Sequence, residues 1–314
     1  MTLLFGILSL VVTIALFTVL SPLFILCETF VVLASLAAVY QERKIWLHPK
    51  VPSLTPVGLF KVFCLNVVWM TVCGIGAIAT ALEAAVTGHW LELGHTRKLA
   101  HMVVEQKCAM LVTNLFVGQV IVKGAEHLPD DYPASPAPIY VANHASQIDS
   151  AVVYFIQKQW RWIMKSSIMF LPGVGQVTYL GDHIWINRSR TKDKSKSSKN
   201  SITGARNLYV KSDASIQEGT PMFFFPQGTR RMGERLPFKD GAFKVAKNND
   251  SQLVPISINI PVTAWNSLYP FGTAEPVVLT VHKPIDSKDK DIETLKKEAS
   301  EIIYSVLPDY SKQD

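Results

Sequence analysis

The sequence predicts an α/β domain that follows a membrane-anchoring region, and two observations lead to this fold class. Short apolar segments typical of strands alternate with helical segments from about residue 94 onward, a pattern that indicates a sheet covered by helices. Before that point, the chain contains two long stretches without charged side chains. The 314 residues are enough for one domain and an additional region. We therefore expect anchoring helices over residues 1–92 and a globular domain over residues 93–314.

The anchoring region has the length and composition of membrane segments. Residues 1–27 and 62–82 carry no charge, and about 20 apolar residues suffice to cross a bilayer. Pro22 interrupts the first run, because proline breaks a helix, and the glycines of Gly74–Gly76 interrupt the second. We expect two to four apolar segments. A cleaved signal peptide is the alternative for the first run, but the run is too long and lacks a basic start.

The basic connector over residues 41–50 is expected to face the cytosol. If the second apolar run simply crossed the bilayer, the globular domain would then lie on the opposite side. We therefore expect either a hairpin at Gly74–Gly76 or an interfacial arrangement of this run. The net charge of +6 favours an anionic partner, and beside an apolar anchor this is first of all a membrane surface.

Cysteine and charge patterns narrow the function further. The four cysteines, at positions 27, 64, 73 and 108, form no CxxC pair, so we expect neither a disulfide framework nor a metal site. Residues 188–199 hold six basic side chains and one acidic one. A solvated loop is the favoured interpretation of that segment. A nucleic-acid site is disfavoured because the segment lacks the aromatic side chains on which bases stack.

The globular region divides into expected strands and helices. Apolar runs ended by turn residues predict strands within residues 113–129, 137–143, 182–187, 220–230, 251–261 and 274–285. Helical spacing predicts helices over residues 147–160, 200–219 and 291–307. Gly219 is expected just beyond the end of the second helix and Asp291 at the start of the third, where glycine and aspartate are favoured caps.

The segment VANHASQID contains a histidine and an aspartate that can act as a pair. A neutral imidazole at His144 can accept a proton from an alcohol, and a carboxylate at Asp149 can orient the ring. On a straight helix the two side chains would point about 140° apart, so the pair requires a strand–turn–helix bend at Asn143. The alternative is that Asp149 caps a helix and His144 is a polar loop residue.

Two further segments can bind an anion. In FFFPQGTRR, the backbone of Gly228 and Thr229 and the side chain of Arg230 suit a phosphate, although an ordinary turn with exposed arginines would look the same. Lys165 lies in a largely apolar run. It can snorkel toward water or point into a charged site.

Together these segments resemble the glycerolipid acyltransferase family, specifically 1-acyl-sn-glycerol-3-phosphate (lysophosphatidic acid) acyltransferases. The resemblance extends over roughly residues 118–261, and four blocks occur in order, which is far more specific than one HxxxxD match. The matching residues are Asn143, His144 and Asp149, then Lys165, Pro172 and Gly175, then Gly181, Ile184, Ile186 and Arg188, then Phe225, Pro226, Gly228, Thr229 and Arg230, and finally Val254, Pro255 and Ile256.

The resemblance implies a mixed sheet flanked by helices and an acyltransferase domain over residues 93–314. It implies transfer of a fatty acyl group from acyl-CoA, a co-substrate, to the sn-2 hydroxyl of lysophosphatidic acid, without another cofactor, metal or nucleic-acid partner. His144 would be the general base and Asp149 its orienting group, with backbone N–H groups near the turn stabilising the oxyanion. The substrate-binding residues would be Lys165, Arg188, Phe225, Pro226, Gln227, Gly228, Thr229 and Arg230. Membrane lipids would be the partners, and the endoplasmic reticulum membrane, with a cytosol-facing site, the expected location.

The chain departs from the family at three positions. Gln227 stands where the family has glutamate, Asn187 where it usually has aspartate, and Ser167 where an acidic residue is frequent. Glutamine keeps an acceptor oxygen but loses the charge. These changes leave two alternatives open, namely a different lysophospholipid acceptor and a catalytically weak lipid-binding homologue.

Overall fold

A seven-stranded sheet forms the centre of the molecule. The computed structural model describes residues 29, 55–88, 93–130, 135–186, 208–230, 235–261, 263–266 and 268–308. The strands are β1 (Gly118–Lys123), β2 (Ile139–Ala142), β3 (Arg161–Lys165), β4 (Ile184–Ile186), β5 (Met222–Phe224), β6 (Leu253–Asn259) and β7 (Thr273–Val281). Their order across the sheet is β1-β7-β6-β2-β5-β3-β4.

The sheet is mixed, as the sequence predicts. Strands β6, β2, β5, β3 and β4 run parallel to one another, whereas β7 runs antiparallel to β6 and parallel to β1. Parallel neighbours need crossover segments, which here contain helices. The carboxyl ends of these five adjacent strands therefore lie along one edge of the sheet.

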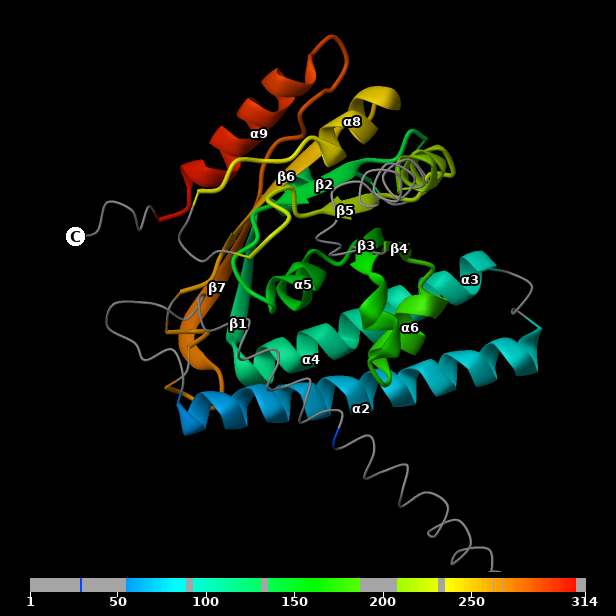
Figure 1. Cartoon of the computed structure of the whole chain (residues 1–314), viewed down its shortest axis with the longest axis vertical. Coiled ribbons are helices and arrows are strands. Elements are labelled where there is room, and N and C mark those ends of the chain that lie inside the picture. Colours follow the sequence, from blue (N-terminus) through cyan, green and yellow to red (C-terminus); the bar gives the residue numbers. More distant parts are fainter. Residues whose placement is uncertain are drawn as a thin grey trace, which may run out of the picture.

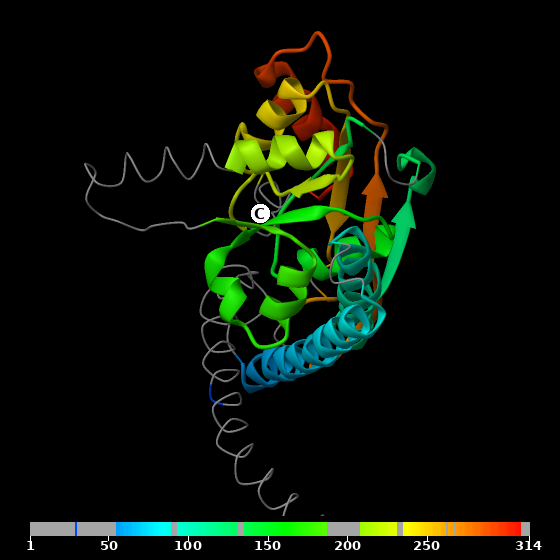
Figure 2. The ribbon, with the colours of Figure 1, turned by 90° about the vertical axis from the view of Figure 1, so that its right-hand side faces the viewer.

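Helices cover both faces of the sheet (Figure 1). On one side lie α2 (Pro56–Thr87), α4 (Gln106–Phe116), α5 (Asp149–Val152) and α6 (Val174–Leu180). On the other side lie α8 (Gly241–Asn248), α9 (Ile292–Ser305) and a helix over residues 208–217. Figure 2, in which the sheet is seen from another side, separates these two layers. The expected fold class, an α/β mixed sheet flanked by helices, is confirmed.

The alternation of side chains along β2 divides the core in two. Ile139 and Val141 pack with Ile216 and with the α8 and α9 side of the sheet. Tyr140 and Ala142 pack with the α2 and α4 side. Because successive strand residues point to opposite faces, a strand buried on both faces is apolar throughout, which is why IYVA reads as a continuous apolar run.

Helix α2 runs without a break through Gly74–Gly76, so the expected hairpin at these glycines is wrong. Glycine weakens a helix interior by only about 1 kcal/mol, and here it permits close packing. The α-carbon of Gly173 lies against Gly74, and a side chain at Gly76 would collide with Val104. Among the described residues, α2 is the one helix long and apolar enough to cross a membrane. The other expected anchoring segments lie outside the described residues.

One face of α2 packs on the domain along its whole length. Its buried residues extend from Gly58 near the start to Ala84 near the end, and Val62, Leu65, Cys73 and Ala77 belong to the same hydrophobic core as β2. The helix α3 (Leu93–Lys98), a π-helical turn η2 (Leu99–Glu105) and α4 then return along α2. The helices that pack beside α2 thus begin at residue 93.

Candidate active site

The candidate site residues lie at the carboxyl ends of parallel strands. His144 follows β2, Phe225 to Arg230 follow β5, and Lys165 ends β3. Since β2, β5 and β3 are parallel neighbours, these ends meet at one edge of the sheet. In open parallel sheets this edge is where ligands bind. Arg188 follows β4 in the sequence but lies outside the described residues.

The side chain of Asn143 creates the bend that the pair requires. Its Nδ2 donates to the carbonyl of Ile258 at 2.9 Å, and its Oδ1 accepts the N–H of Ile258 at 2.7 Å. The amide thereby continues the β2–β6 ladder after the main chain has left the strand. The chain turns through residues 144–148, and α5 begins at Asp149.

His144 and Asp149 are in direct contact. Nδ1 of His144 lies 2.8 Å from Oδ2 of Asp149, and Asp149 is fully buried whereas 18% of the His144 side chain is exposed. The same carboxylate oxygen accepts the backbone N–H groups of Ala145 at 2.6 Å and Ser146 at 2.9 Å. A carboxylate that accepts three donors holds the proton on Nδ1, which leaves the lone pair of Nε2 available as a base.

Phe225 fixes the plane of the imidazole. Its ring is stacked on that of His144, with centroids 4.1 Å apart and an interplanar angle of 11°. The ring of Phe225 also packs against the rings of Trp162 and Phe223, with centroid distances of 5.6 Å and 5.3 Å. Stacked rings and the Asp149 hydrogen bond together restrict both the tilt and the rotation of His144.

Gln227 contacts the turn that carries His144. It is almost fully buried, and its Oε1 accepts the backbone N–H of His144. The glutamine oxygen therefore does what a glutamate oxygen could also do at this position. Gln227 does not line the cavity that opens beside His144.

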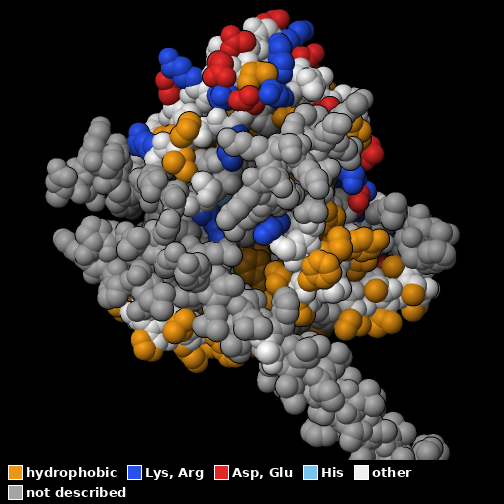
Figure 3. Space-filling model, in the orientation of Figure 1, with side chains coloured by type: hydrophobic (Ala, Val, Ile, Leu, Met, Phe, Trp, Pro, Cys, Tyr) orange, Lys and Arg blue, Asp and Glu red, His pale blue; other side chains and the backbone are white. Residues whose placement is uncertain are grey.

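A cavity of about 510 Å³ opens beside His144. Helix α2 supplies Leu65, Trp69, Met70 and Cys73 to its wall, and α6 supplies Val174 and Val177, whereas the strand ends supply polar side chains. The polar lining residues include His144, Gln147, Ser150, Lys165, Ser167 and Arg230, and Asn66, Glu105 and Thr178 also reach the wall. In Figure 3, hydrophobic side chains gather along the lower edge of the molecule, over α2. The cavity thus has a basic polar side and an apolar side toward α2.

The remaining residues of the FPQGTR loop shape it rather than line the cavity. Gly228 has φ +67°, and a side chain there would meet Nζ of Lys239 at 2.5 Å. The N–H of Lys239 donates to the carbonyl of Pro226 at 2.9 Å, which closes the loop. Thr229 is exposed. Of the six loop residues predicted from the sequence, Phe225 and Arg230 reach the cavity.

A buried polar network lies behind the aromatic wall, and the sequence did not reveal it. Trp162 Nε1–H donates to the hydroxyl of Tyr154 at 2.9 Å, and that hydroxyl donates to Oε2 of Glu105 at 2.5 Å. Nδ1 of His183 accepts the N–H of Trp162 at 3.1 Å, so its Nε2–H donates to Glu105 at 3.0 Å. Glu105 also lines the cavity.

The ionisation of this network follows from its burial and contacts. Burial opposes ionisation of Glu105, but the His183 ring and the hydrogen bonds from His183 and Tyr154 outweigh it and hold the pKa of Glu105 below its usual value. Burial and the adjacent Glu105 raise the pKa of Tyr154 well above its usual value. Burial lowers the pKa of His101, which packs on Tyr154, to about 3.

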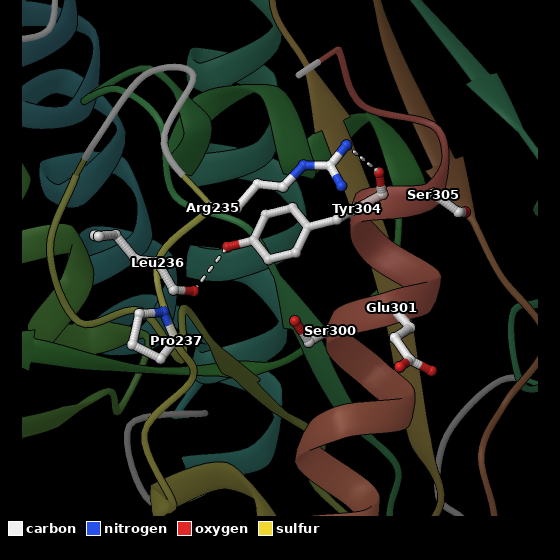
Figure 4. Close-up of a pocket in the computed structure, with 7 residues that line it drawn as sticks. All are labelled: Arg235, Leu236, Pro237, Ser300, Glu301, Tyr304 and Ser305. Carbon is white, nitrogen blue, oxygen red and sulfur yellow. Dashed lines mark hydrogen bonds between the residues drawn. The ribbon is translucent and has the colours of Figure 1, made fainter. Parts of the chain in front are cut away.

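A second, more open cavity of about 440 Å³ lies beside α9 (Figure 4). Arg235 donates to the carbonyls of Tyr304 and Leu307 at the end of this helix, both at 3.2 Å, and the Tyr304 hydroxyl donates to the carbonyl of Leu236 at 3.0 Å. These groups pair with one another and anchor the chain that follows Arg230. Among the described residues, no group of three His, Cys, Asp or Glu side chains is arranged to hold a metal ion.

Comparisons with known proteins show that the chain is similar to acyltransferases. Residues 119–259 match the family model described as Acyltransferase. A 1-acyl-sn-glycerol-3-phosphate acyltransferase of Chlamydomonas reinhardtii is 31% identical over 68% of this chain and 60% of the relative. A chloroplastic one of Brassica napus is 26% identical over 73% and 62%, and the human beta form is 29% identical over 47% and 50%.

The chain therefore spans only about half to three-fifths of the length of these curated relatives. Among solved structures, the 1-acyl-sn-glycerophosphate acyltransferase of Thermotoga maritima superposes with a TM-score of 0.54 at 20% identity, over 79% of this chain and 92% of that one. At this identity the likeness concerns the fold.

Proposed function

Because the chain contains an acyltransferase-family domain at residues 119–259, we propose that it transfers a fatty acyl group from acyl-CoA to the sn-2 hydroxyl of 1-acyl-glycerol-3-phosphate, giving phosphatidic acid. One observation carries the proposal. The His144–Asp149 pair, 2.8 Å apart, opens onto a cavity with cations on one side and an apolar wall on the other. An acyl transfer between a lipid alcohol and a thioester needs these three components.

In this mechanism His144 acts as the general base. Its Nε2 takes the proton of the acceptor hydroxyl as that oxygen attacks the thioester carbonyl. Asp149 holds the ring and stabilises the imidazolium that forms. When the tetrahedral intermediate collapses, the C–S bond breaks, and the departing thiolate takes the proton back from His144. No acyl-enzyme intermediate is required.

The acceptor phosphate and the acyl chains occupy opposite sides of the cavity. Lys165 and Arg230 line the polar side, and guanidinium can pair two phosphate oxygens at once. Arg188, which follows β4 in the sequence, is proposed as a third cation for the phosphate. Hydrocarbon is sheltered from water against α2 and α6, where Leu65, Met70 and Val177 line the wall.

The test is to assay purified full chain with radiolabelled acyl-CoA and a panel of lysophospholipids. We expect His144→Ala to abolish transfer without loss of folding, because it removes the proton acceptor. His95→Ala, which replaces an exposed histidine of α3, is the matched control and should transfer normally. Near-normal turnover by His144→Ala would contradict the mechanism. Preference for a lysophospholipid with a head group beyond phosphate would contradict the acceptor.

We also propose that α2 attaches the domain to one leaflet. The face of α2 opposite the core exposes Phe60, Ile75, Ile78, Leu82 and Val86. A helix that packs on a globular domain from Gly58 to Ala84 cannot cross a bilayer away from that domain. An interfacial position keeps the cavity beside its lipid substrate. The finer location, the endoplasmic reticulum membrane with a cytosolic site, is tested by protease protection of intact microsomes.

A further inference from the structure

The oxyanion of the tetrahedral intermediate needs a hydrogen-bond donor near His144. The catalytic turn is the expected source, but its backbone donors are largely engaged. The N–H of His144 donates to Gln227, and those of Ala145 and Ser146 donate to Asp149. The N–H of Ile148 donates to the hydroxyl of Ser146 at 3.1 Å. These four groups hold the turn in shape, so releasing one would disturb the His144–Asp149 pair.

The side chain of Gln147 lies in the same turn and lines the same cavity as His144. Its Nε2 is buried and has no hydrogen-bond partner within the described residues. A buried amide without a partner costs about 1–3 kcal/mol, so such a group in a native protein requires an explanation, and a catalytic role is one of the recognised ones. The backbone behind it is fixed, since the Ser150 hydroxyl donates to the carbonyl of Gln147 at 3.0 Å.

Other donors on the cavity wall have different tasks. The Ser150 hydroxyl already donates its hydrogen bond to the carbonyl of Gln147. Lys165 is exposed, and its full charge, like that of Arg230, suits the acceptor phosphate. Gln147 offers a neutral donor instead, which stabilises a developing negative charge without first binding the anionic acceptor.

We propose that Gln147 is a catalytic residue whose Nε2–H donates to the thioester carbonyl oxygen as this oxygen becomes an oxyanion. The assignment rests on the proposed acyl transfer. As the acceptor oxygen bonds to the carbonyl carbon, its proton moves to Nε2 of His144, and the π pair of the C=O bond moves onto the carbonyl oxygen. Gln147 stabilises that charge. The pair then reforms the C=O bond, the thiolate leaves, and the proton of His144 passes to sulfur.

Two substitutions separate a donor role from others. Gln147→Met keeps the length of the side chain but removes hydrogen bonding, and Gln147→Glu keeps an acceptor oxygen but removes the donor. Loss of one oxyanion donor typically lowers kcat by about 10²–10³-fold. We expect both variants to lose roughly 100-fold or more in kcat, with the KM values for acyl-CoA and for lysophosphatidic acid and the unfolding temperature nearly unchanged.

The matched controls are Gln119→Met and Gln119→Glu, which alter an exposed glutamine of β1 and should leave the kinetics unchanged. Wild-type kcat in either Gln147 variant would overturn the assignment. A kcat that only Gln147→Glu retains would also overturn the assignment, because it would indicate that Gln147 acts as an acceptor. A loss confined to KM would overturn it as well, because it would indicate a role in substrate binding. If the unaltered chain transfers no acyl group to any lysophospholipid, the proposed function itself fails. If the unaltered chain is active and the Gln147 variants are equally active, only the assignment of Gln147 fails.

Discussion

At the scale of single residues, Gln227 explains how the chain departs from the family that it resembles without losing the geometry of the candidate site. The resemblance implies that Gln227 is a substrate-binding residue. In the structure its oxygen instead accepts the N–H of His144. Either a glutamine or a glutamate can provide that oxygen, so the departure preserves the catalytic turn.

This contact gives a prediction for two variants of Gln227. Gln227→Glu keeps the acceptor and should retain acyl transfer to lysophosphatidic acid within a few-fold. Gln227→Leu leaves the N–H of His144 buried without an acceptor, at a cost of about 1–3 kcal/mol. We expect kcat to fall steeply in that variant, measured beside its unfolding temperature. Equal activity of the two variants would mean that the contact does not position His144.

His101 makes stability depend on pH. Its ring is buried, neither ring nitrogen has a hydrogen-bond partner among the described residues, and burial lowers its pKa from 6.5 to about 3. Between these two values the unfolded chain binds a proton that the folded chain does not. Stability is therefore lost as the pH falls below about 6.5, by up to about 1.4 kcal/mol per pH unit.

We expect His101→Phe to reduce this loss, because phenylalanine keeps an aromatic ring against Tyr154 and Trp160 and carries no titrating group. The measurement is the unfolding midpoint of both proteins at pH 7 and pH 5. The difference between the two pH values should be smaller in the variant. An identical shift in both proteins would assign the acid sensitivity to other groups.

At the scale of elements, the contact between α2 and α6 is set by glycines. Gly173 has φ +74°, and a β-carbon there would lie 2.1 Å from the carbonyl oxygen of Met70. Gly74, on the facing helix, would place its β-carbon 3.6 Å from Gly173, an ordinary contact. Only one of the two glycines is therefore required for the crossing.

The matched pair Gly173→Ala and Gly74→Ala tests this contact. Gly173→Ala combines a left-handed backbone with a backbone clash and should destabilise the fold by roughly 3 kcal/mol or more. Gly74→Ala should be neutral or stabilise by up to about 1 kcal/mol through helix propensity. Denaturant midpoints of both variants give the comparison. An equally large loss in Gly74→Ala would contradict this account, because it would mean that the contact with Gly173 leaves no room for a methyl group at Gly74.

Some elements were predictable and others were not, for physical reasons. Strand β2 was predictable because its residues form an unbroken apolar run. Helix α9 was predictable because it begins at the cap Asp291, whose carboxylate accepts the N–H of Thr294. The helix expected over residues 147–160 ends early, since Gln157 adopts φ +53° and β3 follows. Strand β3 escaped prediction because RWIMK begins and ends with a charged residue.

The candidate site also contains features that the sequence predicted and features that it did not. The requirement for a bend between His144 and Asp149 followed from helix geometry alone, and the structure contains that bend. The Glu105 network could not be foreseen, because Glu105 lies 49 residues from Tyr154 and 78 from His183 along the chain. Contacts between residues so far apart leave no local pattern. Gln147 could not be singled out from the sequence, because its assignment rests on the burial of its amide and on its place in the cavity wall.

At the scale of the whole molecule, the orientation of α2 relative to the bilayer can be measured. Val57, Ile75 and Val86 lie on one exposed stripe of the helix, at about 100° per residue. Spin labels at these three positions, in a background without the native cysteines, should report similar depths near the headgroup boundary. A central position for Ile75, with Val57 and Val86 near opposite surfaces, would instead indicate that α2 crosses the membrane.

The long face that α2 shares with the rest of the domain has a consequence for kinetics. If the proposed acyl transfer and the proposed interfacial position of α2 hold, a cavity whose wall is this helix receives its acceptor by diffusion in two dimensions. The rate would then follow the mole fraction of lysophosphatidic acid among the lipids rather than its amount per volume of solution. Adding inert phospholipid at constant total substrate would lower the surface concentration of lysophosphatidic acid and would therefore slow the reaction.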